Sequence, residues 1–166
     1  LGDVYKRQSV YAPNGCSPDK KTEQAKLAYK LHWFDMFNRR ALYLKKTGYP
    51  VVIGGDFNVM MQDIDVFDGS RFKNSPLYRK EVWDKIKALQ FSGYHDAFRL
   101  LHPHTEGFTF WDYTANSFVT NSGLRIDYLF ITAQFAEQLV TCGADKSLRS
   151  MDKPSDHTAL VAEFGK

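Results

Sequence analysis

The fold of this 166-residue chain is decided by Val51-Val52-Ile53-Gly54-Gly55-Asp56-Phe57-Asn58. The first three residues are β-branched and apolar on both faces, which predicts a central strand in a sheet that is covered on both sides. The glycines and the Asp-x-Asn follow where such a strand ends, so short polar side chains would lie at one edge of the sheet. The stretch therefore predicts a buried strand that leads into a candidate polar site.

The segments around this strand predict layered α/β or α+β packing. A long amphipathic helix is predicted from about Lys20 to Lys46, and Thr47-Gly48-Tyr49-Pro50 should end it. A second helix is predicted to open at Ser75-Pro76, with Ser75 as the N-cap and Pro76 at the first helical position. Further strand segments are predicted at Val10 to Ala12 (the end of a strand), Phe108 to Trp111, Ile126 to Ile131 and Thr158 to Phe164.

The first eight residues, Leu1-Gly2-Asp3-Val4-Tyr5-Lys6-Arg7-Gln8, contain no initiator Met and no apolar periodicity. They match a translated sequencing-library adapter, so we expect natural sequence to begin near Ser9 and the octet to be an artefact outside the natural fold. An ordinary N-terminal tail and a cleaved propeptide are the alternatives. The expected organisation is therefore an artefactual segment 1–8 followed by residues 9–166, the C-terminal portion of a single domain.

The composition is that of a globular protein with one sizeable core, since 43% of the residues are hydrophobic and 25% are charged. A formal net charge of +3 permits a polyanionic partner without demonstrating one. Cys16 and Cys142 have no CxxC spacing and are interpreted as free thiols in a reducing compartment. No apolar run of about 18 residues predicts a membrane span.

Two short polar motifs indicate chemistry at the ends of strands, namely Asp56-Phe57-Asn58 and Ser155-Asp156-His157. Carboxylates suit a hard cation such as Mg²⁺, and a nearby histidine could hold a phosphate oxygen or move a proton. Each motif alone is also typical of an ordinary turn after a strand. Asp127 adds a carboxylate within an apolar strand, where it needs a partner. Together these residues favour metal-assisted hydrolysis of a phosphodiester.

Four collinear segments resemble the exonuclease III family of Mg²⁺-dependent apurinic/apyrimidinic (AP) endonucleases, in the endonuclease/exonuclease/phosphatase superfamily. These segments are Val51 to Asn58, Phe108 to Tyr113, Gly123 to Tyr128 and Lys153 to His157. The resemblance implies an α/β (α+β) fold, a partial four-layered α/β sandwich with two packed β-sheets and its N-terminal portion missing. It also implies that a family Asn and a metal-binding Glu precede Tyr11, so a complete metal site cannot be assembled from this chain.

The resemblance implies a role for each motif residue. Asp56 would orient or deprotonate the attacking water, and Asn58 would hold that water or a phosphate oxygen. His157 would contact the scissile phosphate, with Asp127 fixing its tautomer, and Tyr11 would donate its phenolic proton toward the same phosphate. The implied cofactor is Mg²⁺, with Mn²⁺ as the alternative, and the residues expected at the metal site are Asp156, His157, Asp56 and Asn58.

Contacts to DNA are expected on two kinds of residue. By resemblance, Phe110 and Trp111 would line a pocket for an abasic site, and the alternative is that they are core aromatics on a strand. Polar residues beside the motifs suit phosphate contacts, which position a duplex without reading its sequence. These polar residues are Arg71, Lys73, Asn74, Asn121, Ser122 and Arg125. The expected partner is double-stranded DNA with abasic sites or 3′ ends.

The expected function of the intact parent is that of an exodeoxyribonuclease III or AP endonuclease in DNA repair, which cleaves 5′ to abasic sites and trims 3′ ends. The alternatives are another superfamily hydrolase, such as a deadenylase or an inositol-phosphate phosphatase, and a catalytically dead nucleic-acid-binding module. The chain itself is expected to show little nuclease activity and poor stability, because sheet edges and core would be exposed. A cytoplasmic monomer with no membrane partner is expected.

Overall fold

The computed structural model describes residues 5–16 and 20–165, so residues 1–4 of the expected adapter octet lie outside the described part. The strands are β1 (Lys6–Tyr11), β2 (Val51–Asp56), β3 (Tyr94–Asp96), β4 (Asp127–Thr132), β5 (Leu139–Ala144) and β6 (Leu160–Phe164). The helices are α1 (Lys20–Lys46), α2 (Gly69–Phe72), α3 (Lys80–Phe91), α4 (Ala97–Leu101) and α5 (Ala133–Ala136), with short 3₁₀ helices η1 (Asp63–Asp65) and η2 (Lys146–Ser150).

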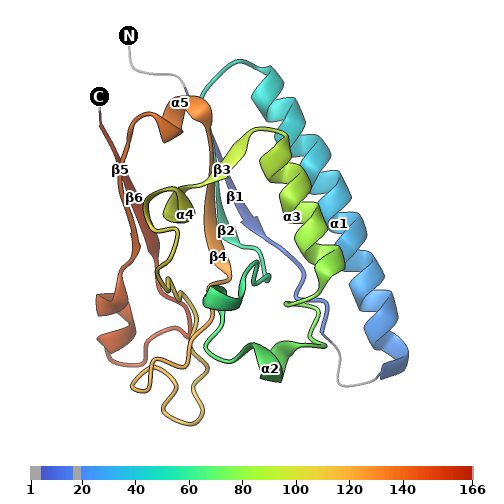
Figure 1. The fold of residues 1–166 in the computed structure, drawn as a ribbon, viewed down its shortest axis with the longest axis vertical. Coiled ribbons are helices and arrows are strands. Elements are labelled where there is room, and N and C mark those ends of the chain that lie inside the picture. The colour runs from blue at the N-terminus through green and yellow to red at the C-terminus, as the bar shows by residue number, and fades with distance from the viewer. Residues whose placement is uncertain (1–4, 17–19, 166) are drawn as a thin grey trace.

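The architecture is mixed α/β with two sheets, as predicted in outline. The larger sheet has the strand order β1-β2-β4-β3, and β5 and β6 form a separate antiparallel pair. Helices α1 and α3 cover one face of the larger sheet, while β5 and β6 lie on its other side (Figure 1). No helix in the described ranges is long and apolar enough to cross a membrane.

The register of the larger sheet aligns three of the predicted site residues. Strand β1 is parallel to β2, with Tyr11 opposite Asp56. Strand β4 is antiparallel to β2, with Asp127 opposite Asp56. Residues directly opposite each other in neighbouring strands point to the same face of a sheet. The three side chains therefore form a row across β1, β2 and β4, at the end of the sheet where β4 begins.

The backbone of β1 includes the last three residues of the expected adapter octet, because β1 begins at Lys6, opposite Val51 of β2. The bonds of a β-ladder are made by backbone groups, so almost any residue can form them. Strand formation by residues 6–8 therefore leaves the origin of the octet an untested expectation.

Helix α1 spans the predicted residues and packs its apolar stripe on the sheet. Phe34 and Ala41 are completely buried, as are Val51 and Ile53 of β2 in the same core cluster. The prediction of a buried central strand is confirmed, because β2 lies between β1 and β4 under this helix. The strand predicted at Ile126 to Ile131 is likewise confirmed as β4, shifted by one residue.

Gly55 explains why the deciding stretch contains glycine immediately before its aspartate. Its φ is +145°, and a Cβ atom there would collide with the backbone carbonyl of Val10 in β1. Only glycine adopts this conformation without strain and allows β1 to approach so closely. The glycine therefore brings Tyr11 and Asp56 side by side.

The second predicted helix does not open at Ser75-Pro76, so that prediction is wrong. Helix α3 begins at Lys80, and the segment from Ser75 to Tyr78 forms a turn in which the Tyr78 N–H donates to the Ser75 carbonyl at 2.9 Å. The carbonyl of Pro76 accepts a hydrogen bond from the buried ammonium of Lys30 at 3.2 Å. That bond holds Pro76 in the turn, so Ser75 caps no helix.

The segment from Phe108 to Trp111 is extended but forms no full strand, which corrects another prediction. Phe110 makes isolated bridges to Leu124 on one side and to His157 on the other. Its two neighbours are separate loops, so the ladder stops after one residue on each side. The segment nevertheless joins the parts of the chain that carry Asp127 and His157.

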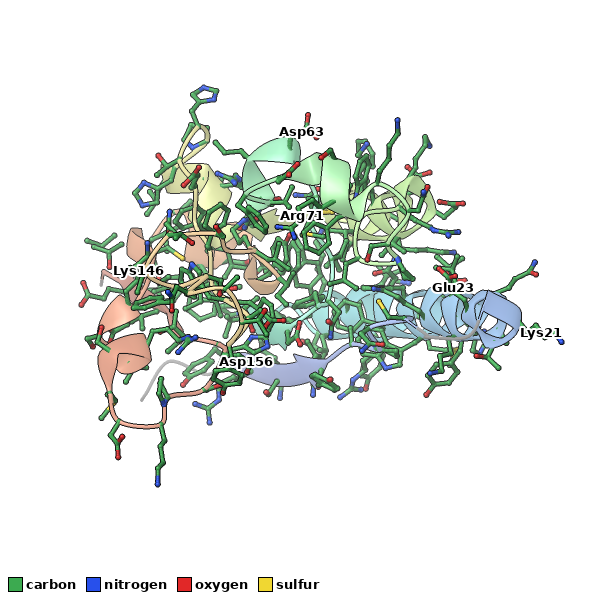
Figure 2. The ribbon with its side chains drawn as sticks, turned by 90° about the horizontal axis from the view of Figure 1, so that it is seen from below. Lys21, Glu23, Asp63, Arg71, Lys146 and Asp156 are labelled. Carbon is green, nitrogen blue, oxygen red and sulfur yellow. The ribbon has the colours of Figure 1, made fainter. Side chains whose placement is uncertain are left out.

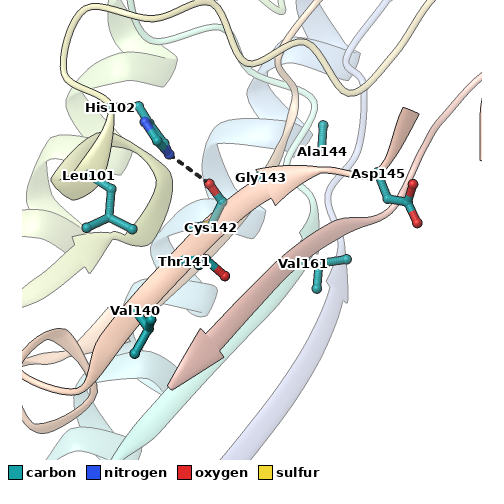
Figure 3. A pocket seen from close by; sticks show the side chains of 9 residues that line it. All are labelled: Leu101, His102, Val140, Thr141, Cys142, Gly143, Ala144, Asp145 and Val161. Atoms are coloured by element: carbon teal, nitrogen blue, oxygen red, sulfur yellow. Dashed lines mark hydrogen bonds between the residues drawn. The ribbon is translucent and has the colours of Figure 1, made fainter. Parts of the chain in front are cut away.

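A hollow lies beside β5 and away from the predicted site (Figure 3). Its volume is about 600 Å³, and its lining includes Leu101, Val140 and Val161. His102 places its Nε2 atom 3.1 Å from the Cys142 carbonyl, so this histidine bonds the backbone of β5. The groove contains none of the predicted site residues.

Candidate active site

Asp56 and Asn58 form a closed pair at the end of β2. The Asp56 carboxylate accepts hydrogen bonds from the Asn58 backbone N–H at 2.7 Å and from Asn58 Nδ2 at 2.9 Å. Asn58 Nδ2 also donates to the Ala12 carbonyl at 2.9 Å. Both amide protons are therefore used in orienting Asp56 and the turn after β1. Only the Oδ1 atom of Asn58 remains to meet a water or a cation.

Lys30 of α1 holds this turn by hydrogen bonds, a role that no local sequence pattern predicts. The side chain is completely buried. Its ammonium donates to the carbonyls of Asn58 at 2.6 Å, Asn14 at 3.0 Å and Pro76 at 3.2 Å. Burial lowers the pKa of Lys30 to about 8, partly offset by the nearby Cys16 and Asp56. One cation thus ties together the loops after β1, after β2 and before α3.

Asp127, at the start of β4, is the partner of His157. The Nδ1 atom of His157 lies 2.9 Å from Asp127 Oδ2, and the same oxygen accepts the Thr109 hydroxyl at 2.6 Å. The predicted Asp–His pair is thus brought together across 30 residues of sequence. If Nδ1 carries the proton, Nε2 is the ring nitrogen left for a substrate.

Phe110 packs against the imidazole of His157, and Asp156 precedes that histidine in the chain. The two rings have a centroid separation of 5.1 Å and an interplanar angle of 66°. The backbone carbonyl of Asp156 accepts the Trp111 N–H at 2.9 Å, which fixes the loop before β6. The Asp156 side chain is half-buried. Figure 2 views the molecule from below and labels Asp156 together with Arg71 and Lys146.

The positive charges near Asp56 do not offset the effects that raise its pKa. Burial is the main cause that raises the pKa of Asp56 to about 6, and the charge of Asp127 adds to it. The Asn58 hydrogen bond and the charges of His157 and Lys30 oppose the rise without cancelling it. A carboxyl whose pKa is raised by burial and by a neighbouring carboxylate is typical of a functional site.

The same charges act on His157 in the opposite sense. The hydrogen bond to Asp127 raises the pKa of His157, burial opposes the rise, and the charges of Asp127, Asp56 and Asp156 add to it. The imidazolium form of His157 is therefore kept to a higher pH than in an ordinary histidine. Such a group can hold an anionic phosphate oxygen or donate a proton to it.

The donor set fits a hard cation, although it is sparse. Asp56 and Asp156 offer carboxylate oxygens and Asn58 offers an amide oxygen, which are the ligands that Mg²⁺ prefers when it also keeps several waters. Among the residues described, no group of three or more His, Cys, Asp or Glu side chains is arranged to hold a metal ion. A cation here would therefore take much of its coordination from water or from phosphate.

Arg125 is corrected from a phosphate contact to an interior residue. Its side chain is completely buried, with Nε 2.7 Å from Asp65 Oδ1 and Nη1 2.7 Å from Asp96 Oδ2. Asp65 also pairs with Arg99 and accepts the backbone N–H of Met61 at 3.1 Å. Local sequence could not reveal this network, because the partners of Arg125 lie 29 and 60 residues away.

Trp111 is also corrected, since its side chain is completely buried and cannot line an open pocket in this structure. It packs edge-on against Phe118 at 5.2 Å, and Lys146 lies over its ring at 5.3 Å. The alternative of a core aromatic therefore holds for Trp111. Phe110 remains half-buried beside His157, where it can meet a substrate.

The remaining predicted DNA contacts lie in helix α2 and in the loops that follow it and precede β4. Arg71 and Ser122 line a hollow of about 300 Å³. The side chains of Lys73 and Asn74 are exposed, whereas Asn121 is held between Glu106 at 3.2 Å and Lys146 at 3.1 Å. Arg71 and Lys73 are thus exposed cations, with Arg71 lying over the Phe67 ring at 5.5 Å, and Asn121 is bonded to neighbouring side chains.

Comparison with known proteins shows the family to which this chain belongs. The sequence profile of the Endonuclease/Exonuclease/phosphatase family matches residues 20–157. The exodeoxyribonuclease III of Haemophilus influenzae is 34% identical over 134 residues, which are 74% of this chain and 49% of that protein. The exodeoxyribonuclease of Bacillus subtilis is 26% identical over 151 residues, which are 90% of this chain and 58% of that protein.

Two solved structures resemble the fold closely. An AP endonuclease from Archaeoglobus fulgidus has a TM-score of 0.86 and 31% identity, covering 94% of this chain and 60% of that one. The 3′ phosphatase NExo from Neisseria, bound to product DNA hairpin, has a TM-score of 0.86 and 28% identity, covering 95% of this chain and 60% of that one. The chain therefore spans about half the length of these two curated relatives and 60% of these structures.

Proposed function

Because the chain belongs to the Endonuclease/Exonuclease/phosphatase family, we propose that its parent protein is a Mg²⁺-dependent DNA-repair nuclease. The parent hydrolyses the phosphodiester 5′ to an abasic site and trims 3′ ends. The resemblance to exonuclease III and the AP endonucleases is confirmed by the relatives. The proposal rests above all on the His157–Asp127 pair, which lies beside Asp56 at one end of the sheet.

The reaction assigned to the site is displacement at phosphorus by water. Asp56 takes a proton from the water as its oxygen bonds to phosphorus. The bond from phosphorus to the 3′ oxygen then breaks, and that oxygen takes up a proton from solvent water to leave as a hydroxyl. A pKa of about 6 supports this role, because Asp56 is then largely ionised at neutral pH and more basic than an ordinary aspartate.

His157 and Tyr11 bind and polarise the phosphate in this scheme. Asp127 accepts from Nδ1 of His157, so Nε2 is available to a phosphate oxygen. Tyr11 is 71% exposed at the end of the same row, and its phenolic O–H can donate to that phosphate. The amide protons of Asn58 act through Asp56 and the turn after β1, since both are already bonded, and its Oδ1 atom is left for the cation.

Asp156, Asp56 and the Oδ1 atom of Asn58 would hold the cation at the site. Mg²⁺, or Mn²⁺ in its place, would supply charge stabilisation at the phosphate and at the leaving oxygen. The proposed four-layered sandwich and the remaining ligands belong to the whole parent, since the present two-sheet arrangement corresponds to 60% of the AP endonuclease chain.

Double-stranded DNA is the proposed substrate. The Neisseria relative is bound to a product DNA hairpin, which supports a DNA ligand for this fold. Arg71 offers an exposed guanidinium for the backbone, and Phe110 offers a ring beside His157 for the gap left by a lost base. The same relative is a 3′ phosphatase, so removal of a 3′ phosphate is a second candidate activity.

The test uses the protein encoded by the whole reading frame that contains this chain, obtained by sequencing the source DNA across the codon for Ser9. Duplexes with one abasic site, duplexes with a 3′ phosphate, and poly(A) are compared with Mg²⁺ and with EDTA. We expect Mg²⁺-dependent incision 5′ to the abasic site, with a loss of at least about a hundredfold in His157→Ala. Lys80→Ala, at an exposed pair on α3, is the matched control.

Three results would overturn the proposal. Preferred cleavage of poly(A) would identify a deadenylase-type hydrolase, and tight binding of abasic duplex without cleavage would identify a binding module. Equal activity of the wild type and His157→Ala would show that the pair is not catalytic. The chain alone is expected to cleave weakly or not at all, and strong cleavage that Asp156→Ala abolishes would contradict that expectation.

A further inference from the structure

Thr109 lies where the separate segments of the site meet, and none of the roles assigned to the site accounts for its side chain. The residue is completely buried. Its backbone N–H donates to the Leu124 carbonyl at 2.8 Å, and its carbonyl accepts the Thr158 N–H at 2.8 Å. Its backbone is thus fixed between the segment that leads into Asp127 and the residue that follows His157.

The hydroxyl of Thr109 uses its full hydrogen-bonding capacity. It accepts the backbone N–H groups of Ile126 at 3.3 Å and Asp127 at 3.2 Å. A hydroxyl has one proton and two lone pairs, so the proton is left to donate in one remaining direction. That direction leads to Asp127 Oδ2 at 2.6 Å.

The oxygen that Thr109 reaches is the one that faces the imidazole. Asp127 Oδ2 lies 2.9 Å from His157 Nδ1, so one carboxylate oxygen sits between the hydroxyl and the ring. We propose that Thr109 is a positioning residue whose hydroxyl holds the Asp127 carboxylate in the orientation that accepts the Nδ1–H of His157. Its importance for catalysis rests on the proposed function, whereas the orientation itself does not.

A second hydrogen bond to the carboxylate has a chemical consequence as well as a geometric one. Asp127 lies opposite Asp56 in the sheet, and two neighbouring carboxylates repel each other. The hydroxyl donates to the same oxygen that faces Nδ1, so it holds Oδ2 toward the ring against the repulsion of Asp56. An oxygen held there accepts from Nδ1–H, which favours that tautomer and leaves Nε2 free to meet an anionic oxygen.

The experiment measures the tautomer of His157 by ¹⁵N NMR of the imidazole in the metal-free chain, at a pH where a titration followed by the same signals shows the ring to be neutral. The wild type is expected to show mainly the Nδ1–H form. Thr109→Val removes the donor at almost constant volume and should lower the ratio of Nδ1–H to Nε2–H by roughly tenfold, the effect of one hydrogen bond to a charged group. Thr109→Ser keeps the hydroxyl and should restore the wild-type ratio.

Thr132→Val is the matched control, because Thr132 is 2% exposed on the same strand as Asp127 and its hydroxyl accepts the Val51 N–H at 3.0 Å, away from the site. It should destabilise the chain without changing the tautomer. An unchanged tautomer in Thr109→Val, or an equal change in Thr132→Val, would overturn the proposal.

A second measurement covers the case in which Thr109→Val fails to fold. In the wild type, the Thr109 hydroxyl proton should exchange slowly and show a through-space contact to the Asp127 amide. Fast exchange would overturn the proposal. Neither readout needs cleavage of DNA, so a failure here can be told apart from a failure of the proposed function.

Discussion

Two clusters of carboxylates and cations occupy neighbouring segments of this chain, and they differ in their balance of charge. The interior cluster is balanced, since Asp65 and Asp96 face the guanidinium groups of Arg125 and Arg99. The carboxylates there have full partners, and Asp65 accepts backbone N–H groups in addition. Buried charges that are paired and hydrogen-bonded in this way hold loops together.

The site cluster is unbalanced. Asp56, Asp127 and Asp156 lie around a single imidazole, and the pKa of Asp56 rises to about 6 in consequence of burial and like charge. The two clusters come close together in the sequence, because Arg125 belongs to the interior cluster and Asp127 to the site cluster. The contrast teaches that charge compensation, more than burial, separates the structural carboxylates from those available for a cation and a phosphate.

Breaking the balanced cluster should give the largest effect. Arg125→Met leaves Asp65 and Asp96 without their main partner, and removal of one member of a buried ion pair costs about 3–5 kcal/mol of the free energy of unfolding. Urea denaturation measures this loss. Lys80→Met removes an exposed pair with Asp84 and should change stability little. A loss below about 1 kcal/mol in Arg125→Met would mean that the cluster is not structural.

Lys30 is a cation held by carbonyls alone, and its effect depends on pH. Its pKa is about 8 in the folded chain against an ordinary value of 10.5, so the unfolded chain binds the proton more tightly. The stability contributed by this group therefore rises from about pH 8 to 10.5, by about 3 kcal/mol. The rise is the difference between wild type and Lys30→Met in urea melts across that range. A parallel pH dependence of the two proteins would contradict it.

The unbalanced cluster should show the opposite slope at acidic pH. Asp56 has a folded pKa of about 6 against an ordinary value of 3.8, so ionisation is harder in the folded state. The free energy of unfolding should fall as pH rises from about 4 to 6, by about 1–2 kcal/mol after allowance for solvent screening. Urea melts in EDTA would show this fall in the wild type and not in Asp56→Asn. A flat profile in the wild type would mean that burial and the neighbouring charge of Asp127 do not raise the pKa of Asp56.

A smaller effect is expected at His157. Its raised pKa means that the stability it contributes is present below pH 6.5 and is lost as pH rises through the folded value. Asp127→Asn removes the main cause of the rise, so the pKa of His157, followed by NMR, should fall toward its ordinary range. An unchanged pKa would assign the rise to Asp56 and Asp156 instead.

The sequence predicted those parts of the fold whose signals are local. Helix α1 and strands β2 and β4 follow from periodicity and from short apolar runs, and the structure confirms them. The opening of the second helix at Ser75-Pro76 was predicted wrongly, because a distant ammonium, Lys30, determines the conformation there. Local propensity yields to such tertiary contacts.

The candidate site also divides into residues that the sequence could predict and residues whose contacts depend on the fold. Resemblance predicted the pair of Asp127 and His157, which the structure brings together. It could not distinguish Arg125, a buried partner of Asp65, from an exposed phosphate contact, because nothing in its neighbours reports burial. Thr109 was visible only as part of an aromatic segment, and its contact with Asp127 depends on the fold.

The most direct test of the contrast is a Mg²⁺ titration of the chain followed by NMR, with Asp156→Ala alongside. We expect saturable shifts at Asp56 and His157, no shift of the Arg125 Nε–H in the balanced cluster, and weaker binding in Asp156→Ala. Shifts at Arg125 without shifts at Asp56, or binding that Asp156→Ala leaves unchanged, would contradict the assignment of the unbalanced cluster as the cation and phosphate site.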